Sequence, residues 1–490
     1  MKKALALILA LLLALSLAAC SGSTTPADDV AADAPADAST ADTEKPADSE
    51  PAQATEEPGN IPEKPEGPIT IQVSVAQKGD GFTVLTDAAA AFNASQSDYA
   101  VDLYYGGSYT EIMTIMQTSA EADRPAIFAS SGNDTALYIA MEDKMYIPVQ
   151  DFIDAEGYDD SNIVASLRAN YQRDGKWQCW PLGNTNVGQY YNADILSSLG
   201  IDVKSLTSYA DIYAACEKIA EAGYKNFYYM RALTHIDWLN YALTAQGVEY
   251  FDNNNGRDGV PTKCLYDEAE CNAATLAFFQ FLRDVVDKGD WLLDPTIEST
   301  DAWVSFANQD VLLMDGYVSG ANSIVSLVAD SGNPFNWTYE VSPVVEAGKP
   351  SKGQSPGGGA LFIANTGDYW VQQGAWEFMK YLMTDQVVCD YAMATGYIPV
   401  TTTGAEAAEY KDYIANEFPS AATVIEAQNA TEEGIAYAPI PFSSSVNTAY
   451  KDICQKILAD PSYTAEMAVA ELTERTNEAV ELYRLTEGLD

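Results

Sequence analysis

The pattern of apolar and polar residues predicts alternating strands and helices from about residue 68 onward. Residues 69–76 alternate as a β-strand does, and residues 82–93 carry apolar side chains at helical spacing. A second strand at 101–105, a helix at about 109–120 and a third strand at 126–130 follow. Strands and helices that alternate at this spacing predict βαβ units and a mostly parallel sheet.

The alternation of helices and strands continues through the second half of the chain. Helices are predicted at 193–199, 209–222, 236–246, 268–289 and 372–383, and strands at 226–230, 311–314 and 360–364. Residues 252–259 resemble a calcium loop, but Gly256 and Arg257 stand where an EF-hand needs Asp or Asn and then Gly. We expect a plain turn there, within an α/β fold.

Residues 177–194 interrupt this regular pattern. Trp177 and Trp180 precede small polar residues that fit no regular element, and an aromatic, strand-like sequence follows at 188–192. The segment can be a crossing between two α/β lobes, with its backbone and rings facing a small polar ligand. The alternative is a surface loop between two strands, with both tryptophans in the core, because buried tryptophan is common.

The first 19 residues form a secretory signal peptide. Lys2 and Lys3 precede a leucine and alanine run that ends in Leu-Ala-Ala-Cys. This ending resembles a lipobox, in which Cys20 is acylated and becomes the first mature residue. The alternatives are a plain signal-peptidase site and an uncleaved membrane helix, for which the run is short. We expect an extracytoplasmic protein held at the cell membrane by its lipid anchor alone.

Residues 20–67 comprise the lipidated cysteine and an acidic tether. Beyond Cys20, this stretch is built mainly from Ala, Pro, Asp, Glu, Ser and Thr and contains no aromatic residue. It cannot bury enough apolar surface to fold, so we expect it to be disordered.

Charge and residue usage exclude several classes of partner and cofactor. The chain has 71 acidic and 26 basic residues and a net charge of -45, which repels nucleic acid and anionic lipid head groups. His235 is the sole histidine and no Cys-x-x-Cys pair occurs, so we expect no metal, no cofactor and no Ser-His-Asp triad. Six cysteines besides Cys20 permit disulfides in an exported protein; Cys264 and Cys271 could clasp a hairpin or stay free and buried.

Several sequence segments, taken in order, resemble those of family 1 extracellular solute-binding proteins of ABC importers. They are the Tyr190, Tyr191, Asn192 crossing, FANQDVLLMDG at 306–316, PGGGALFIA at 356–364 and TGYIPV at 395–400. The resemblance covers residues 68–490 and is most marked for the glycerol-3-phosphate-binding and oligosaccharide-binding branch. It implies a two-lobe, periplasmic-binding-protein-like (type II) fold with a hinge and a ligand cleft between the lobes.

The resemblance also implies how the chain divides. Crossings are expected near 181–187, 341–343 and 390–394. Lobe 1 then comprises residues 68–186 and 344–390, and lobe 2 comprises residues 187–343 and 391–490.

Carried over residue by residue, the resemblance implies ligand contacts from both lobes. These are Tyr109, Asn184, Thr185, Trp238, Ser319, Gly358 and Tyr397. The family's acidic residue after the third strand falls near Gly132, with Asp134 two positions further on. Trp180, Trp238, Tyr317 and Tyr397 are candidates to stack on a sugar ring, and core packing is the alternative for each.

The ligand is expected to be a neutral sugar. The arginine that the glycerol-3-phosphate binders contribute late in the chain has no counterpart in 439–454, and phosphate is usually held by a guanidinium. We expect a monomeric lipoprotein that delivers a mono- or oligosaccharide to the transmembrane subunits of an ABC permease and is not an enzyme. One alternative is glycerol-3-phosphate or a glycerophosphodiester, held by Lys352 or Arg231. Another is a surface glycoside hydrolase, which would need two carboxylates about 5 to 10 Å apart.

The anchor generates the first prediction. Acylation needs the Cys20 thiol, so Cys20→Ala should lose its lipid and leave the membrane fraction when exported cells are fractionated. If the variant stays membrane-bound after export, the lipobox interpretation is wrong.

Overall fold

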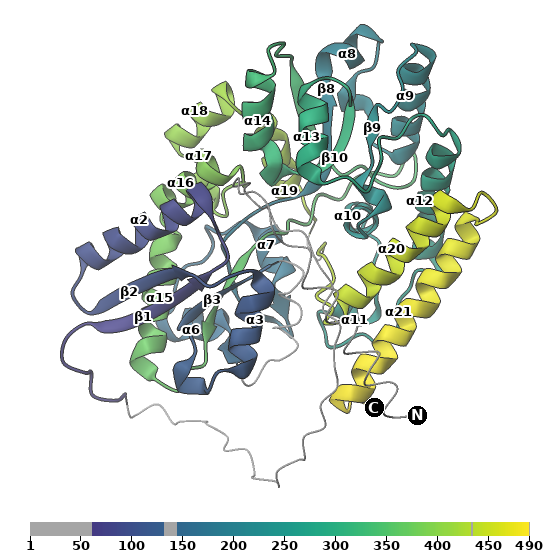
Figure 1. Ribbon diagram of the computed structural model, residues 1–490. Helices are drawn as coiled ribbons and strands as arrows, with labels where there is room; N and C mark the ends of the chain where they lie inside the picture. Colours follow the sequence, from purple (N-terminus) through teal and green to yellow (C-terminus); the bar gives the residue numbers. More distant parts are fainter. Residues whose placement is uncertain (1–60, 132–144, 433–434, 490) are drawn as a thin grey trace, which may run out of the picture. The chain divides into compact units, whose positions relative to one another are not determined.

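Two β-sheets, each covered by helices, make up the folded part of the chain. A computed structural model describes residues 61–131, 145–432 and 435–489 (Figure 1). Residues Glu57–Asp490 form one compact unit, and the α/β class expected from the sequence is confirmed by the mixture of sheets and helices. Within the described residues, every helix is too short or too polar to span a membrane.

The first sheet begins with parallel strands, and strands from later in the chain make it a mixed sheet. β1 pairs in parallel with β2 and β3, as the βαβ pattern predicts, whereas β12 arrives from much later in the chain and runs antiparallel to its neighbours. Its strands in order are β2 (Tyr99–Tyr105), β1 (Ile69–Val75), β3 (Ile127–Ser130), β12 (Ala360–Ala364) and β4 (Tyr146–Ile147), and β7 (Trp180–Pro181) also pairs with β12.

Helices cover this sheet. Near it lie α2 (Gly79–Ser95), α3 (Tyr109–Thr118), α6 (Val149–Glu156), α7 (Ala165–Asn170), α15 (Tyr369–Leu382) and α16 (Asp385–Thr395), with the short η1 (Glu121–Asp123) and the hairpin β5 (Gln172–Arg173) and β6 (Lys176–Trp177). The start of α3 is fixed by a capping box, in which the Ser108 side chain accepts from the Glu111 N–H and Glu111 accepts from the Ser108 N–H. This cap sets the position of Tyr109, the first residue of the helix.

The second sheet is mainly antiparallel. β8 (Val187–Asn192) lies between β11 (Trp337–Val341) and β10 (Leu313–Tyr317) and runs antiparallel to both, while the short β9 (Tyr228–Tyr229) adds in parallel to β10. β8 is buried along its whole length. Aromatic residues on the two faces of β8 therefore pack into two separate hydrophobic cores.

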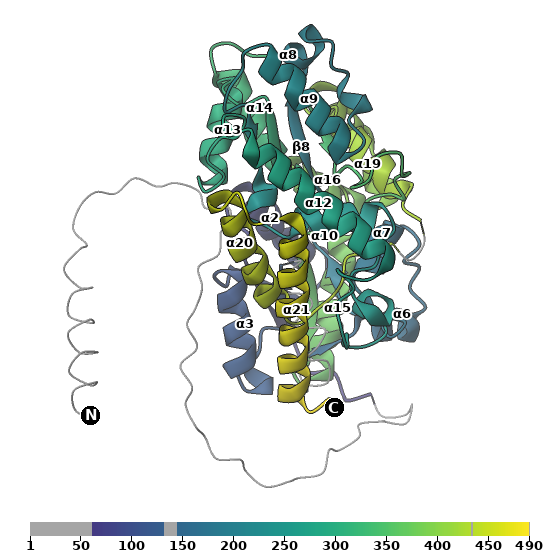
Figure 2. The same cartoon turned by 90° about the vertical axis from the view of Figure 1, so that its right-hand side faces the viewer.

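The remaining helices belong to the part of the chain from residue 193 on. They are α8 (Ala193–Ser198), η2 (Val203–Ser205), α9 (Tyr209–Glu221), η3 (Arg231–Leu233), α10 (Asp237–Ala245), α11 (Asp252–Gly256), α12 (Ala269–Asp287), α13 (Ser299–Ala307), η4 (Val318–Gly320), α14 (Ala321–Asp330), α17 (Thr402–Glu406), α18 (Ala408–Asn416), α19 (Ala421–Asn429), α20 (Ser443–Ala459) and α21 (Ala465–Glu487). Figure 2 shows α20 and α21 lying side by side next to α12, and all three contact one another.

Three clusters of buried apolar side chains form the core. One fills the first sheet and its helices, a second lies between the second sheet and α9, α10, α12, α20 and α21, and a third packs β8 and β10 against α13, α14 and α18. Helix α16 contributes to two of them, since Tyr391 packs in the first cluster and Ala392 in the third. The residues predicted as the third crossing, 390–394, thus lie inside a helix that joins two cores.

One local expectation differs from the structure, and one alternative that the sequence left open is settled. The predicted turn at 252–259 begins as α11, in which Asn253, Asn254 and Asn255 have φ of 54, 55 and 56°. Asparagine tolerates this left-handed conformation better than most residues. The six cysteines other than Cys20 are all free and buried, so Cys264 and Cys271 do not form a clasp.

Trp180 supports the core of the first lobe. Its side chain is fully buried, and its ring centroid lies 5.0 Å from that of Trp177 and 5.1 Å from that of Trp376. A buried Trp→Ala change usually costs about 3 to 5 kcal/mol. We therefore expect Trp180→Ala to lower the free energy of unfolding by about that amount in urea titrations followed by circular dichroism.

Trp370 provides the matched control for this prediction. It is only partly buried and its indole N–H donates to the Pro62 carbonyl at 3.0 Å, so Trp370→Ala should cost about 1 kcal/mol. Equal losses for the two variants would show that the Trp180 cluster does not carry the stability assigned to it.

Candidate functional site

The crossing segment, residues 182–186, links the two sheets and is buried throughout. It leaves the first sheet at β7 and enters the second at β8. A glycine-rich stretch lies against it: the Leu182 and Gly183 N–H groups donate to the Gly359 carbonyl at 2.9 and 3.0 Å, and Thr185 exchanges two backbone hydrogen bonds with Gly357. The crossing is therefore paired like a strand although it belongs to neither sheet.

Gly358 is required by this close approach. Its φ of +121° lies in the region that favours glycine, and a Cβ at this position would lie 2.5 Å from the Gly183 carbonyl oxygen. Gly183 in turn lies against the ring of Tyr397, which a Cβ would approach to 2.9 Å. The two predicted residues Gly358 and Tyr397 thus flank the crossing on opposite sides.

Tyrosines gather around this crossing. The Tyr109 hydroxyl accepts from the Gln77 amide at 2.9 Å, and the Tyr171 hydroxyl donates to the Gly358 carbonyl at 3.1 Å. Tyr391 and Tyr397 stack with ring centroids 6.0 Å apart. Burial raises the pKa of Tyr171, Tyr391 and Tyr397, so these hydroxyls remain protonated.

A second group of aromatic residues surrounds Asp237, the first residue of α10. Its buried carboxylate accepts from the Tyr317 hydroxyl at 2.5 Å and from the Tyr437 hydroxyl at 3.0 Å. The ring of Tyr241, one turn further along α10, lies 5.2 Å from that of Tyr437. A Cβ on Gly357 would come within 2.3 Å of the Tyr241 hydroxyl, so this group adjoins the glycine-rich stretch.

Arg231 adds a positive charge to the second group. Its guanidinium carbon lies 5.3 Å from the ring centroid of Tyr317 and 5.9 Å from that of Trp238, and Nη1 donates to Ser299 Oγ at 2.7 Å. Among the residues that the structure describes, no carboxylate oxygen lies within 4.0 Å of it. Burial and the neighbouring guanidinium lower the pKa of His235 to about 3, so this histidine is neutral.

The predicted residues Thr185 and Ser319 connect the crossing to the second sheet. The Ser319 N–H donates to Thr185 Oγ1 at 3.4 Å, and Ser319 follows directly on the strand that carries Tyr317. Tyr109, Thr185, Gly358 and Tyr397 therefore lie around the crossing, with Tyr317 and Ser319 at the adjoining edge of the second sheet.

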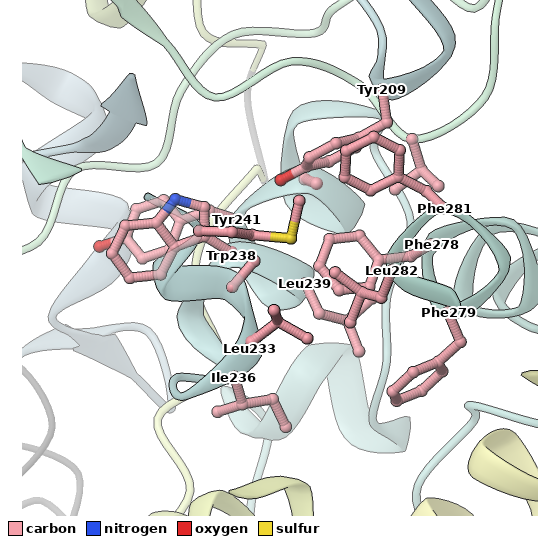
Figure 3. Packing of buried hydrophobic residues seen from close by; sticks show 14 of the residues in the cluster. Tyr209, Leu233, Ile236, Trp238, Leu239, Tyr241, Phe278, Phe279, Phe281 and Leu282 are labelled. Atoms are coloured by element: carbon pink, nitrogen blue, oxygen red, sulfur yellow. The ribbon is translucent and has the colours of Figure 1, made fainter. Parts of the chain in front are cut away.

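Three predicted residues are engaged by the protein itself. Trp180 lies in the core of the first lobe. Asn184 has no exposed surface, and its amide donates to the Pro399 carbonyl at 3.1 Å and to Gln428 Oε1 at 2.9 Å while accepting from Gln428 Nε2 at 2.7 Å. Trp238 is 1% exposed and packs from α10 into the second core, where Figure 3 shows it among the aliphatic and aromatic residues of that cluster. Asp134, which the sequence also predicts as a ligand contact, lies outside the described residues.

The sequence did not single out Asp237, Tyr241 and Tyr437. Asp237 and Tyr241 share one face of α10 because they are four residues apart. That spacing was a usable signal, whereas Tyr437 comes from a distant loop that no local pattern places there. Groups of three or more His, Cys, Asp or Glu able to hold a metal are absent from the described part of the chain.

Asp315, two residues before Tyr317 on β10, is a buried carboxylate behind this second group. It accepts from Gln189 Nε2 at 3.0 Å, from the Tyr228 hydroxyl at 3.1 Å and from the Ala232 N–H at 3.0 Å. Burial raises its pKa to about 6, although these donors act in the opposite direction.

The sequence profile of the bacterial extracellular solute-binding protein family matches residues 87–418. The chain is 23% identical to the sn-glycerol-3-phosphate-binding periplasmic protein UgpB of Brucella melitensis over 342 residues, which are 68% of this chain and 75% of that protein.

Two solved structures illustrate the likeness of fold. One is the cyclic alpha-maltosyl-1,6-maltose binding protein from Arthrobacter globiformis, with a TM-score of 0.67 and 18% identity over 85% of this chain and all of that one. The other is UgpB from Mycobacterium tuberculosis in complex with glycerophosphocholine, with a TM-score of 0.64 and 16% identity over 86% of this chain and all of that one. At these identities the likeness shows the fold alone, which is that of two-lobe periplasmic binding proteins.

The raised pKa of Asp315 generates a pH prediction. Below pH 4 the Asp315 carboxyl is protonated in both the folded and the unfolded state. As the pH rises, this carboxyl ionises near pH 4 in the unfolded chain but only near pH 6 in the folded chain. The free energy of unfolding therefore falls across this window. Relative to Asp315→Asn, the wild type should lose about 2 to 3 kcal/mol of unfolding free energy between pH 4 and pH 7. Urea titrations of both proteins at each pH measure this difference, and a difference independent of pH would contradict the assigned pKa.

Proposed function

Because the chain belongs to the bacterial extracellular solute-binding proteins, we propose that it captures a mono- or oligosaccharide outside the cell and delivers it to the transmembrane subunits of an ABC permease. Proteins of this family bind solutes for import and are not enzymes. In this proposal Cys20 carries the lipid, residues 21–67 form the tether, and the protein acts as a monomer.

The observation that carries the sugar proposal is the junction between the crossing and the Asp237 group. Around Gly357 and Gly358 the protein gathers tyrosine rings, tyrosine hydroxyls and one buried carboxylate. Sugars present an apolar CH face, which stacks on aromatic rings, and hydroxyls, which need both donors and acceptors. This junction supplies both kinds of contact.

We assign ligand contacts from lobe 1 to Tyr109, Thr185 and Gly358 and from lobe 2 to Tyr317, Ser319 and Tyr397, and we add Asp237 and Tyr437. The lobe boundaries are those expected from the sequence. Trp180, Asn184 and Trp238 are assigned supporting roles instead, because their side chains contact protein on all sides. Similar solved structures include a binding protein for a cyclic maltosyl-maltose, which supports an oligosaccharide.

One observation favours a second candidate ligand, glycerol-3-phosphate or a glycerophosphodiester. Arg231 lies over Tyr317 without a carboxylate partner among the described residues, and a guanidinium is the group that usually holds phosphate. Lys352, the other basic candidate, has Glu432 Oε2 at 3.7 Å from its Nζ and lies against Gly247. A phosphate would therefore bind at Arg231 and not at Lys352.

The two ligand classes are separated by a thermal-shift and calorimetry panel of neutral sugars and glycerol phosphates at low and high salt. A neutral sugar should bind with an affinity that changes little with salt, because no ion pair is screened. Steep loss of affinity with salt would favour the phosphate, and binding of neither class would contradict the proposed function.

Arg231→Gln sharpens this experiment. If Arg231 holds a phosphate through charge-assisted hydrogen bonds, the variant should lose about 1.5 to 3 kcal/mol of binding free energy for glycerol-3-phosphate and much of the salt dependence. Arg475→Gln is the matched control, since it removes the same charge at a surface pair with Asp452. Equal losses for the two variants would mean that only the overall charge of the protein matters.

A further inference from the structure

We propose that Asp315 is a positioning residue, which sets the place of Arg231 in the ligand site by holding the turn that carries it. The inference rests on the proposed function and, within it, on the second candidate ligand, whose phosphate Arg231 would hold. Asp315 touches no ligand itself, because its side chain is 2% exposed and lies behind the site.

The Asp315 carboxylate joins three strands to one turn. Oδ1 accepts from Gln189 of β8 and from Tyr228 of β9, and Oδ2 accepts from the Ala232 N–H at 3.0 Å. Ala232 is the middle residue of η3, which begins at Arg231. The carboxylate thus ties the backbone next to Arg231 directly to the second sheet.

The Ala232 peptide unit is held from the opposite side as well. Its carbonyl accepts from the Tyr450 hydroxyl of α20 at 2.5 Å, while the Arg231 carbonyl accepts from the N–H groups of Thr234 and His235 at 2.9 and 3.1 Å. With the backbone fixed at these points, the Arg231 side chain is the part of the turn that projects over Tyr317 and Trp238.

Asp315 also links the two chain segments that meet at Arg231. Asp315 and Tyr317 lie on the same face of β10, because side chains two residues apart in a strand point the same way. β10 therefore carries the Tyr317 ring and, through Asp315, anchors the turn that carries Arg231. The guanidinium carbon of Arg231 lies 5.3 Å from the centroid of that ring.

A carboxylate is a costly residue for this place. The titratable groups whose pKa its charge raises are neutral ones: Tyr191 from β8, Tyr209 and Cys216 from α9, Tyr228 and Tyr229 from β9, Tyr339 from β11 and Tyr450 from α20. No Lys, Arg or His side-chain nitrogen of the described residues lies within 4.0 Å of its oxygens. A neutral side chain of the same shape would be less costly here, so stability alone does not require an acid.

The test compares Asp315→Asn with the wild-type full chain. The amide has the same shape, but it cannot accept from all three donors, and one orientation sets its NH₂ against the Ala232 N–H. We measure affinity for sn-glycerol-3-phosphate and maltotriose, the urea midpoint at pH 7.5, and hydrogen exchange of the peptide covering Ala232. The expected result is an unchanged or higher midpoint, about tenfold faster exchange at Ala232, and about tenfold weaker binding of sn-glycerol-3-phosphate, with binding of maltotriose within about twofold of the wild type.

A double variant separates positioning from packing. If Asp315 acts through Arg231, Arg231→Gln and Asp315→Asn together should weaken binding no more than Arg231→Gln alone. Tyr228→Phe is the matched control: it removes a donor to Oδ1 and leaves the Ala232 bond in place, so affinity should stay within about twofold.

Three outcomes would overturn the inference: additive losses in the double variant, a midpoint that falls together with affinity in Asp315→Asn, or unchanged exchange at Ala232. If the wild type does not bind sn-glycerol-3-phosphate, the phosphate candidate fails on its own. The exchange measurement still decides whether Asp315 holds the turn.

Discussion

The structure depends on one requirement: the buried backbone that joins the two sheets must find a hydrogen-bond partner for each peptide group. An unpaired buried N–H or C=O costs as much as a lost hydrogen bond. The partners of residues 182–186 come from four separate segments, namely the glycine-rich stretch at 357–359, Ile398, Val318 and Tyr339. These segments come from distant parts of the chain, so satisfying one short connection brings together the chain parts that make up the proposed site.

The amide network at Asn184 extends the same principle to side chains. Gln428 of α19 bonds the side chains of both Asn184 and Asn186, and Asn186 donates to the Ser355 carbonyl at 3.1 Å. Just beyond the end of α19, Thr431 exchanges hydrogen bonds with the backbone of Gln354. Polar residues that look like ligand contacts in the sequence are used here to brace the connection between the lobes.

Local signals explain what the sequence predicted well. The strand at 360–364 is found at those residues, and the helix at Tyr109 begins where predicted because Ser108 and Glu111 form its cap. The crossing itself was visible as small polar residues between aromatic ones. What the sequence could not supply is the partner of each side chain: Trp180 meets Trp376 and Asp237 meets Tyr437 only after distant segments have packed. A ring beside a crossing can face a ligand or a core, and composition does not distinguish the two.

The six buried thiols have a consequence for the lifetime of the protein outside the cell. Burial raises the pKa of Cys264 to about 12 and that of Cys389 to about 11, so the folded molecule presents almost no reactive thiolate. Unfolding restores ordinary thiol acidity and exposes several cysteines at once to an oxidising medium, where they form disulfides absent from the native fold. Refolding then competes with the formation of these non-native disulfides. How long the protein survives outside the cell is therefore set by how rarely it unfolds, and not by its equilibrium stability.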